Sequence, residues 1–158
     1  MHIVLVRHGI AVRKKGWTGA DLERPLVARG RRQAAGLHKI IGGSRPARIV
    51  SSPALRCVQT ASPLAGRLGL DVELSDSLAT DAGPAAGELC LELLSAAGSA
   101  TTVLLCTHRE VLEVLLPRLA KDFDGRLGHR PAGAKGAAWV LGFEARRLRK
   151  VVYHPPAG

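Results

Sequence analysis

The sequence predicts an α/β fold, a three-layer sandwich in which helices cover both faces of a mostly parallel central sheet. Short apolar runs alternate along the chain with longer segments whose apolar residues recur at helical spacing. The run 101–106 is continuously β-branched or apolar, which is typical of a central strand buried on both faces. Together, the alternation and the buried strand indicate helices packed on a sheet rather than an all-helical or all-strand domain.

The first half of the chain is expected to contain two strands and two helices. Residues 2–7 form an opening strand, and the helical pattern that follows stops at the glycine pair 42–43. Residues 48–50, Arg-Ile-Val, are expected to form a short second strand. Serine suits the N-cap of a helix and proline its first position, so Ser52 and Pro53 should begin the second helix.

The second half should add a third strand, two helices, the central strand and two final strands. The polar, glycine-rich stretch 121–136 is expected to be a loop. A chain of 158 residues is expected to fold as one domain, here 1–154, followed by a C-terminal tail at 155–158. The expected elements lie at 71–74 (strand), from 84 (helix), 101–106 (strand), 111–119 (helix), 137–143 (strand) and 148–153 (strand).

Charge and composition narrow the possible partners. The chain has 23 Lys and Arg against 13 Asp and Glu, a formal charge of +10, which favours anionic ligands in general. The basic runs 29–32 and 146–150 could suggest nucleic acid, but aromatic stacking residues are scarce and no nucleic-acid-binding motif occurs. A solvated surface is therefore the better interpretation, and nucleic acid is not expected as a partner. No particular oligomeric state follows from the sequence.

The cysteines and the apolar runs indicate a cytoplasmic protein. Three cysteines without CxxC spacing suggest reduced thiols. The opening apolar run is too short for a signal peptide, and no stretch approaches the ~20 apolar residues of a membrane span. We therefore expect a cytoplasmic protein without membrane contact.

Three basic segments should meet at one edge of the sheet. Arg7 and His8 end the first strand, Arg56 lies in the first turn of the second helix, and His108 ends the central strand. In a parallel sheet with right-handed crossovers these residues reach the carboxyl edge, where such folds bind ligands. Arginine there suggests a phosphate or carboxylate, and histidine suggests a nucleophile or proton carrier.

These segments carry a family resemblance. The chain resembles the histidine phosphatase (phosphoglycerate mutase-like) superfamily, and its small size is similar to the compact bacterial branch that includes phosphohistidine phosphatases. It is also similar to the C-terminal phosphatase-like domain of actinobacterial two-domain Nudix proteins, although it has no Nudix box. The matching residues are Arg7-His8-Gly9, Arg24-Pro25-Leu26, Ser52-Pro53, Arg56, Gln59-Thr60, His108 and Trp139-Val140-Leu141.

The resemblance implies a phosphoglycerate mutase-like fold and a covalent mechanism. His8 would be the nucleophile that forms a phosphohistidine, while Arg7, Arg56 and His108 hold the phosphoryl group and Arg24 is a fourth contact. Fixed cations stabilise the charge of a transferring phosphoryl group, so no metal or cofactor is expected. His8 must be neutral at its attacking nitrogen, and we expect a backbone carbonyl to hold its other ring N–H.

The general acid is the part of the predicted site for which the sequence offers several candidates. Larger family members carry a Glu after the third strand, or an Asp directly after the second histidine, where this chain has Arg109. Asp81 is the best candidate, and Asp76 and Glu88 are weaker ones. An alkoxide leaving group needs acid help worth about 10²–10⁴-fold. A protonated phosphohistidine or a phosphoanhydride needs little, because its leaving group is only weakly basic.

The expected enzyme is therefore a histidine phosphatase acting on a phosphorylated protein or a small phosphorylated substrate. Phosphohistidine in proteins is the first choice, a nucleotide or other phosphoanhydride the second, and a small phosphomonoester the third. The alternative from another class is a non-catalytic module that binds phosphorylated ligands. The joint presence of Arg7, His8, Arg56 and His108 argues against this module, and the uncertain acid argues for it.

Overall fold

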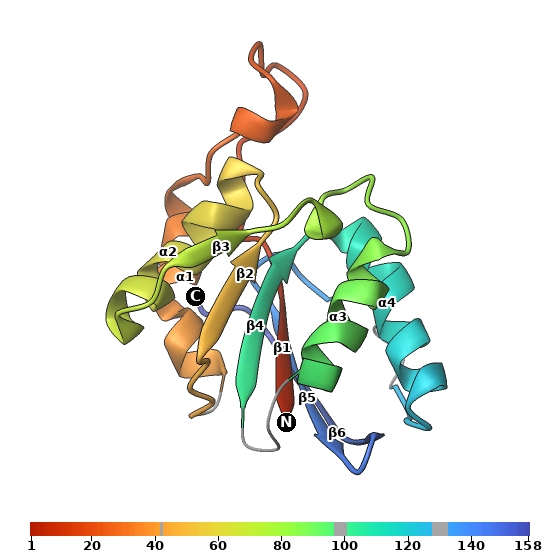
Figure 1. The fold of residues 1–158 in the computed structure, drawn as a ribbon. Helices are drawn as coiled ribbons and strands as arrows, with labels where there is room; N and C mark the ends of the chain where they lie inside the picture. The colour runs from red at the N-terminus through yellow and green to blue at the C-terminus, as the bar shows by residue number, and fades with distance from the viewer. Residues whose placement is uncertain (42, 97–100, 128–132) are drawn as a thin grey trace.

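The computed structural model describes residues 1–41, 43–96, 101–127 and 133–158 (Figure 1). One six-stranded sheet has the order β3-β2-β4-β1-β5-β6. The first four strands in the chain run parallel, whereas β5 is antiparallel to both β1 and β6. The strands are β1 (His2–Arg7), β2 (Arg48–Ser51), β3 (Val72–Leu74), β4 (Thr102–Thr107), β5 (Ala138–Glu144) and β6 (Arg147–His154).

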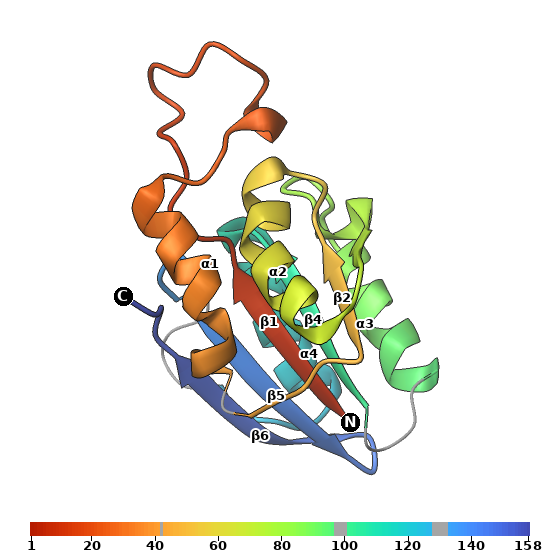
Figure 2. The ribbon, with the colours of Figure 1, turned by 90° about the vertical axis from the view of Figure 1, so that its left-hand side faces the viewer.

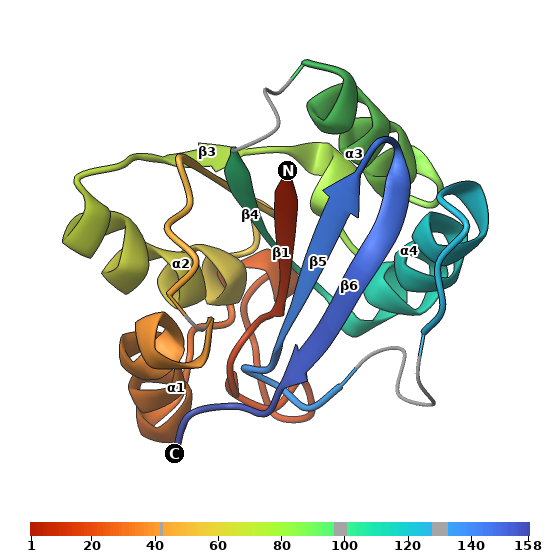
Figure 3. The same cartoon turned by 90° about the horizontal axis from the view of Figure 1, so that it is seen from below.

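Helices cover both faces of the sheet, which confirms the predicted α/β sandwich with a mostly parallel sheet. Figures 2 and 3 show α1 and α2 on one face and α3 and α4 on the other. None of the helices in the described residues is long and apolar enough to cross a membrane. The helices are α1 (Ala28–Ile40), α2 (Leu55–Leu68), α3 (Ala85–Ala96) and α4 (Arg109–Asp122), with short 3-10 turns η1 (Asp21–Glu23) and η2 (Asp76–Leu78).

Alternating residues of β1 face two separate cores. Val4 packs with α1 and α2, while Ile3 and Leu5 pack with α3 and α4. β4 lies between β2 and β1, and all six of its residues are buried. This burial confirms the predicted central strand and explains its uniformly apolar or β-branched sequence.

The start of α2 differs from the prediction. The helix begins at Leu55 with Ala54 as its N-cap, rather than with Ser52 as cap and Pro53 as first residue. The reason lies in the side chain of Ser52, which is buried and hydrogen-bonded to His108 at 2.8 Å. Its hydroxyl is thus engaged at the sheet edge, and only a long 3.4 Å bond from the Ala54 N–H reaches it.

The other expected elements are present with small differences at their ends. α4 extends to Asp122, slightly into the predicted loop, and residues 128–132 of that loop lie outside the described residues. The first glycine of the pair predicted to end the first helix, at position 42, also lies outside them. At the C-terminus, Ala157 lies against Gly36 of α1.

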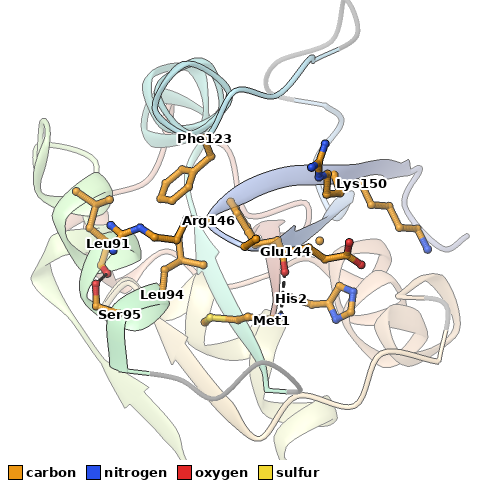
Figure 4. Close-up of a pocket in the computed structure, with 13 residues that line it drawn as sticks. Met1, His2, Leu91, Leu94, Ser95, Phe123, Glu144, Arg146 and Lys150 are labelled. Carbon is orange, nitrogen blue, oxygen red and sulfur yellow. Dashed lines mark hydrogen bonds between the residues drawn. The ribbon is translucent and has the colours of Figure 1, made fainter.

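A cavity of about 570 Å³ opens at the amino end of β1 (Figure 4). Its lining includes Met1, Phe123 and Phe143, together with basic side chains from β6 and from the turn that precedes it. The predicted site residues follow the carboxyl ends of the strands, so this cavity lies at the opposite end of the sheet.

Candidate active site

The structure brings the predicted basic residues together at the carboxyl edge of the sheet. In the parallel register Arg7 of β1 lies beside Thr107 of β4, and Ser51 of β2 lies beside Cys106. The residues that follow these strands, His8 and His108, therefore lie next to each other. Their ring centroids are 5.3 Å apart in an edge-to-face arrangement.

His8 is held as a single neutral tautomer. Its Nδ1 lies 2.8 Å from the carbonyl oxygen of Gly9, which can only accept, so Nδ1 carries the proton and Nε2 keeps its lone pair. The N–H of Gly9 donates to Thr60 Oγ1 at 3.0 Å, which fixes this carbonyl from α2. The backbone carbonyl predicted to hold the second ring nitrogen is thus present.

The surroundings of His8 keep its imidazole uncharged. Burial, followed by the nearby His108 and Arg56, lowers the pKa of His8 to about 3 in spite of the bond to the Gly9 carbonyl, which raises it. The ring is therefore neutral over the whole physiological pH range. A neutral Nε2 is what nucleophilic attack requires.

His108 is also held by bonds to both ring nitrogens. Its Nδ1 lies 3.4 Å from Nη2 of Arg56. A guanidinium cannot accept a hydrogen bond, so Nδ1 accepts and Nε2 carries the proton. Nε2 then donates to Ser52 Oγ at 2.8 Å, with Cys57 Sγ at 3.6 Å. Ser52 and Cys57 are thus additional residues that position the site.

Arg56 and Arg24 share one carboxylate, that of Asp21. Arg56 is buried and donates to the Asp21 carbonyl oxygen at 2.8 Å and to Oδ2 at 3.0 Å. Arg24 donates from Nε to Oδ1 at 2.8 Å and from Nη1 to the Val12 carbonyl at 2.6 Å. Sequence reasoning missed Asp21, although its position three residues before Arg24 is a spacing at which helical side chains meet.

Arg7 points to the other side of the site. Its Nη1 donates to the Gly133 carbonyl oxygen at 2.7 Å, and the Gly136 N–H lies 3.0 Å from the carbonyls of both Arg7 and His8. Burial lowers the pKa of Arg7, as does the charge of Arg109. Residues 133–136 therefore help to hold the end of β1.

Lys135 adds a further cation that the sequence did not indicate. Burial lowers the pKa of Lys135, and so does repulsion from nearby arginines, with Arg7 the strongest. Positive charge from five side chains thus gathers here, those of Arg7, Arg13, Arg24, Arg56 and Lys135. Asp21 is the carboxylate that bonds to two of them, Arg24 and Arg56. Such a concentration of positive charge favours an anion.

The predicted acid, Asp81, lies in an exposed turn after η2. Its side chain makes no hydrogen bond or ion pair with any residue that the structure describes. The weaker candidate Glu88 pairs with Arg118 at 2.7 Å. η2 itself reaches the sheet edge, where Thr107 Oγ1 donates to the Leu78 carbonyl at 2.7 Å.

Two of the comparisons with known proteins concern sequence. A sequence model of the histidine phosphatase superfamily (branch 1) matches residues 3–89, more than half of the chain. The 8-oxo-(d)GTP phosphatase of Mycolicibacterium smegmatis is 31% identical over 159 aligned residues. The alignment covers 98% of this chain but 48% of that relative, so the chain spans about half the relative's length.

Solved structures share the fold over nearly the whole chain. A mycobacterial glucosyl-3-phosphoglycerate phosphatase in complex with VO3 superposes with a TM-score of 0.76, at 19% identity and covering 99% of each chain. The protein histidine phosphatase SixA in complex with tungstate superposes with a TM-score of 0.74, at 20% identity, covering 98% of this chain and 97% of that one. The family match includes Arg7, His8 and Gly9, and the chain belongs to the histidine phosphatase superfamily (branch 1).

Proposed function

We propose that this protein is a phosphatase in which His8 attacks the substrate phosphorus through Nε2 and forms a covalent phosphohistidine. The observation that carries the proposal is the tautomer of His8, since the bond from Nδ1 to the Gly9 carbonyl leaves Nε2 unprotonated. A pKa of about 3 keeps this nitrogen available as a nucleophile at neutral pH. The adjoining cations supply charge for a phosphoryl group.

The reaction has two displacement steps. In the first, the Nε2 lone pair of His8 forms the P–N bond while the bond to the leaving group breaks and the leaving group takes the electron pair. In the second, water attacks the phosphohistidine, releases phosphate, and restores the neutral ring. Arg7 and Arg56 would stabilise the charge on the equatorial oxygens in both steps, with Arg24 as a further contact. His108 would join them through an Nδ1–H, in a protonation state in which Nδ1 no longer accepts from Arg56.

Two buried guanidinium nitrogens without partners support the proposal that an oxyanion binds beside His8. Nε of Arg7 and Nε of Arg56 have no hydrogen-bond partner among the described residues. A buried donor without an acceptor costs free energy of about 1–3 kcal/mol. Phosphoryl oxygens would provide such acceptors, and two neighbours in the same fold are complexes with VO3 and tungstate.

Protein phosphohistidine is the proposed substrate. A phosphohistidine ring that is protonated on its other nitrogen leaves as neutral imidazole, so it needs little help from an acid. This fits a site whose predicted acid, Asp81, is exposed and makes no bond to a described residue. The likeness in fold to the protein histidine phosphatase SixA also supports it.

A nucleotide phosphoanhydride is the second candidate. It is favoured by the curated relative, whose name is 8-oxo-(d)GTP phosphatase. A phosphoanhydride also leaves as a weak base, with a second phosphate pKa near 6, so the acid argument applies to it equally. We place the enzyme in the cytoplasm, where its three buried, free cysteines would stay reduced.

The test is a competition between substrates at matched concentrations, with kcat/KM as the readout. The substrates are a phosphohistidine protein, a nucleoside polyphosphate and a sugar phosphate. His8→Ala should abolish turnover of all three, and replacement of His38, a partly exposed histidine on α1, by alanine (His38→Ala) should not. A higher kcat/KM for the phosphohistidine protein would support protein phosphohistidine as the substrate. A higher kcat/KM for the nucleoside polyphosphate would instead assign the nucleotide phosphoanhydride as the substrate.

A generic chromogenic phosphate separates the enzyme from the non-catalytic binding module. Its activated phenolate leaves without acid help, so the His8 site should hydrolyse it even if no acid is engaged. If the purified protein bound inorganic phosphate but turned over neither this substrate nor the other three, the binding module would replace the enzyme.

A further inference from the structure

One carboxylate joins two arginines of the site, and it comes from the segment between β1 and α1. This segment projects beyond the carboxyl edge of the sheet and is the red-orange loop at the top of Figure 1. The Asp21 side chain is 40% exposed, whereas those of Arg56 and Arg24 are 3% and 14% exposed. A residue at the rim thus holds two guanidinium groups that lie deeper.

The bonds from residue 21 hold Arg56 at both ends of its fork. Nη1 donates to the Asp21 carbonyl oxygen and Nη2 donates to Oδ2. Each terminal nitrogen has a second N–H, and that of Nη2 reaches toward His108 Nδ1. The plane of the guanidinium is therefore fixed while Nε and one N–H of Nη1 remain for a ligand.

Arg24 is arranged in the same way. It uses Nε for Asp21 Oδ1 and one N–H of Nη1 for the Val12 carbonyl. The second N–H of Nη1 and both of Nη2 remain for other acceptors, because a guanidinium has five donors. Asp21 thus orients both groups without using up their donors.

We propose that Asp21 is a positioning residue, which holds Arg24 and Arg56 in the single arrangement that receives the phosphoryl group. This inference rests on the proposed function, because it assigns Asp21 to the same phosphoryl site. Asp21 acts through the two arginines and does not touch the substrate. Preorganised donors stabilise a transition state without reorganising during the reaction.

Asp21 is not suited to serve as the missing acid. Its partial burial raises its pKa, but hydrogen bonds from Arg24 and Arg56 and their charges outweigh this, and the pKa of Asp21 is lowered. The carboxylate is ionised at neutral pH and has no proton to give. The remaining alternative is that the carboxylate competes with phosphate for the two arginines, and the test separates this from positioning.

The base of the segment is anchored independently of Asp21. Ala11 and Leu26 form a β-bridge, the Val12 N–H donates to the Pro25 carbonyl at 2.9 Å, and the Leu26 N–H donates to Gln59 Oε1 at 2.8 Å. Replacing Asp21 should therefore leave the fold intact. A loss of function in the variant can then be assigned to the two arginines.

The experiment compares Asp21→Asn with Asp124→Asn, which also removes one negative charge and one ion pair, here with Arg147. Orthovanadate inhibition of chromogenic phosphate hydrolysis measures oxyanion affinity, and direct calorimetric binding of inorganic phosphate measures it without turnover. We expect Asp21→Asn to lower kcat/KM and both affinities by about ten- to hundredfold, the range for bonds to charged groups. Asp124→Asn should change none of them.

Two further variants distinguish positioning from a general structural role. Asp21→Glu retains the carboxylate and should recover part of the affinity. In the Arg24→Ala background, Asp21→Asn should have a several-fold smaller effect than in the wild type, because residues that act through one another are not additive. Equal unfolding temperatures of Asp21→Asn and Asp124→Asn would confirm that folding is unaffected.

Each possible result of these binding and kinetic measurements supports or overturns the positioning role of Asp21. Unchanged affinity in Asp21→Asn, or full additivity with Arg24→Ala, would overturn it. Tighter phosphate and vanadate binding would overturn it in favour of a competing carboxylate. If the wild type bound phosphate but hydrolysed nothing, the proposed function would fail, and phosphate binding alone would still decide the role of Asp21.

Discussion

The imidazole rings of His8 and His108 lie edge to face, with their centroids 5.3 Å apart. They are separated by a hundred positions in the sequence, and the parallel register of β1 and β4 brings them together. The hydrogen-bond partners place a ring proton on Nδ1 of His8 and on Nε2 of His108. Because the rings are so close, a charge on either one would disfavour a charge on the other.

The first prediction concerns the pH dependence of stability. The pKa of His8 is about 3 in the folded protein and about 6.5 in an unfolded chain. Between these values the unfolded state binds more protons, so the free energy of unfolding should fall as the pH is lowered from 6.5. Denaturant unfolding at pH 7, 6 and 5 should show a loss from this group of at most about 1.4 kcal/mol per pH unit.

Replacing the histidine isolates this contribution. His8→Gln should have a shallower pH slope than the wild type over the same range, because the variant has no imidazole at this position. His38→Gln, which replaces a partly exposed histidine on α1, should keep the wild-type slope. Identical slopes for His8→Gln and the wild type would show that His8 is not held neutral by burial.

The second prediction concerns the hydroxyl of Thr60. This buried oxygen accepts the Gly9 N–H at 3.0 Å and donates to the Arg56 carbonyl at 2.6 Å. Thr60→Val keeps the shape but leaves the buried Gly9 N–H unpaired, which should cost about 1–3 kcal/mol of unfolding free energy. The turnover number should also fall, because the Gly9 carbonyl that orients His8 loses its support.

Thr102 provides the matched control for this substitution. It is buried in β4, and its hydroxyl makes no hydrogen bond to a residue within the described ranges. Thr102→Val should therefore change turnover of the chromogenic phosphate very little. Equal kinetics and equal stability for the two variants would refute the proposed link from α2 to His8.

The third prediction concerns Gly30, near the start of α1. A Cβ atom at this position would collide with the carbonyl oxygen of Ile10, a backbone atom that cannot move aside easily. Ile10 is two residues from His8, so Gly30→Ala should destabilise the fold by about 1–3 kcal/mol, as overpacking does. It should also lower activity, and chemical denaturation with kinetics at the same temperature measures both.

The control is a glycine in a helix with free space around it. A Cβ at Gly66 of α2 would meet no atom within 4 Å. Gly66→Ala should stabilise the protein by about 0.5–1 kcal/mol, the usual difference between the two residues inside a helix. A stabilising Gly30→Ala would show that α1 does not pack against the segment after His8 as described.

The fourth prediction concerns the acid. If Asp81 protonates leaving groups, Asp81→Asn should lower kcat/KM for an alkyl phosphate by about 10²–10⁴-fold. It should leave a phenolic chromogenic phosphate unchanged, because that leaving group needs no proton. Asp71→Asn, another carboxylate change, is the control. Equal loss on both substrates, or no loss on either, would remove Asp81 as the acid.

Much of the fold can be predicted from local patterns. The buried run in β4 predicts a central strand because both of its faces must be apolar, and the alternation of elements predicts a parallel sheet. The first residue of α2 could not be predicted in this way. Serine is a residue type that is common at N-caps, but the hydroxyl of Ser52 is hydrogen-bonded to His108, which is 56 positions away in the sequence.

The candidate site also combines features that local sequence patterns predict with features that depend on contacts between distant segments. Arg7, His8, Arg56 and His108 could be proposed from the sequence because strand ends and helix starts in such a sheet share one edge. The sequence by itself therefore determined that these four side chains reach the shared edge, but not that Asp21 and Lys135 join them. Only the tertiary structure decided how they are held, by Gly9, Thr60, Ser52 and Asp21, because hydrogen bonds between distant segments depend on packing geometry that no local pattern encodes.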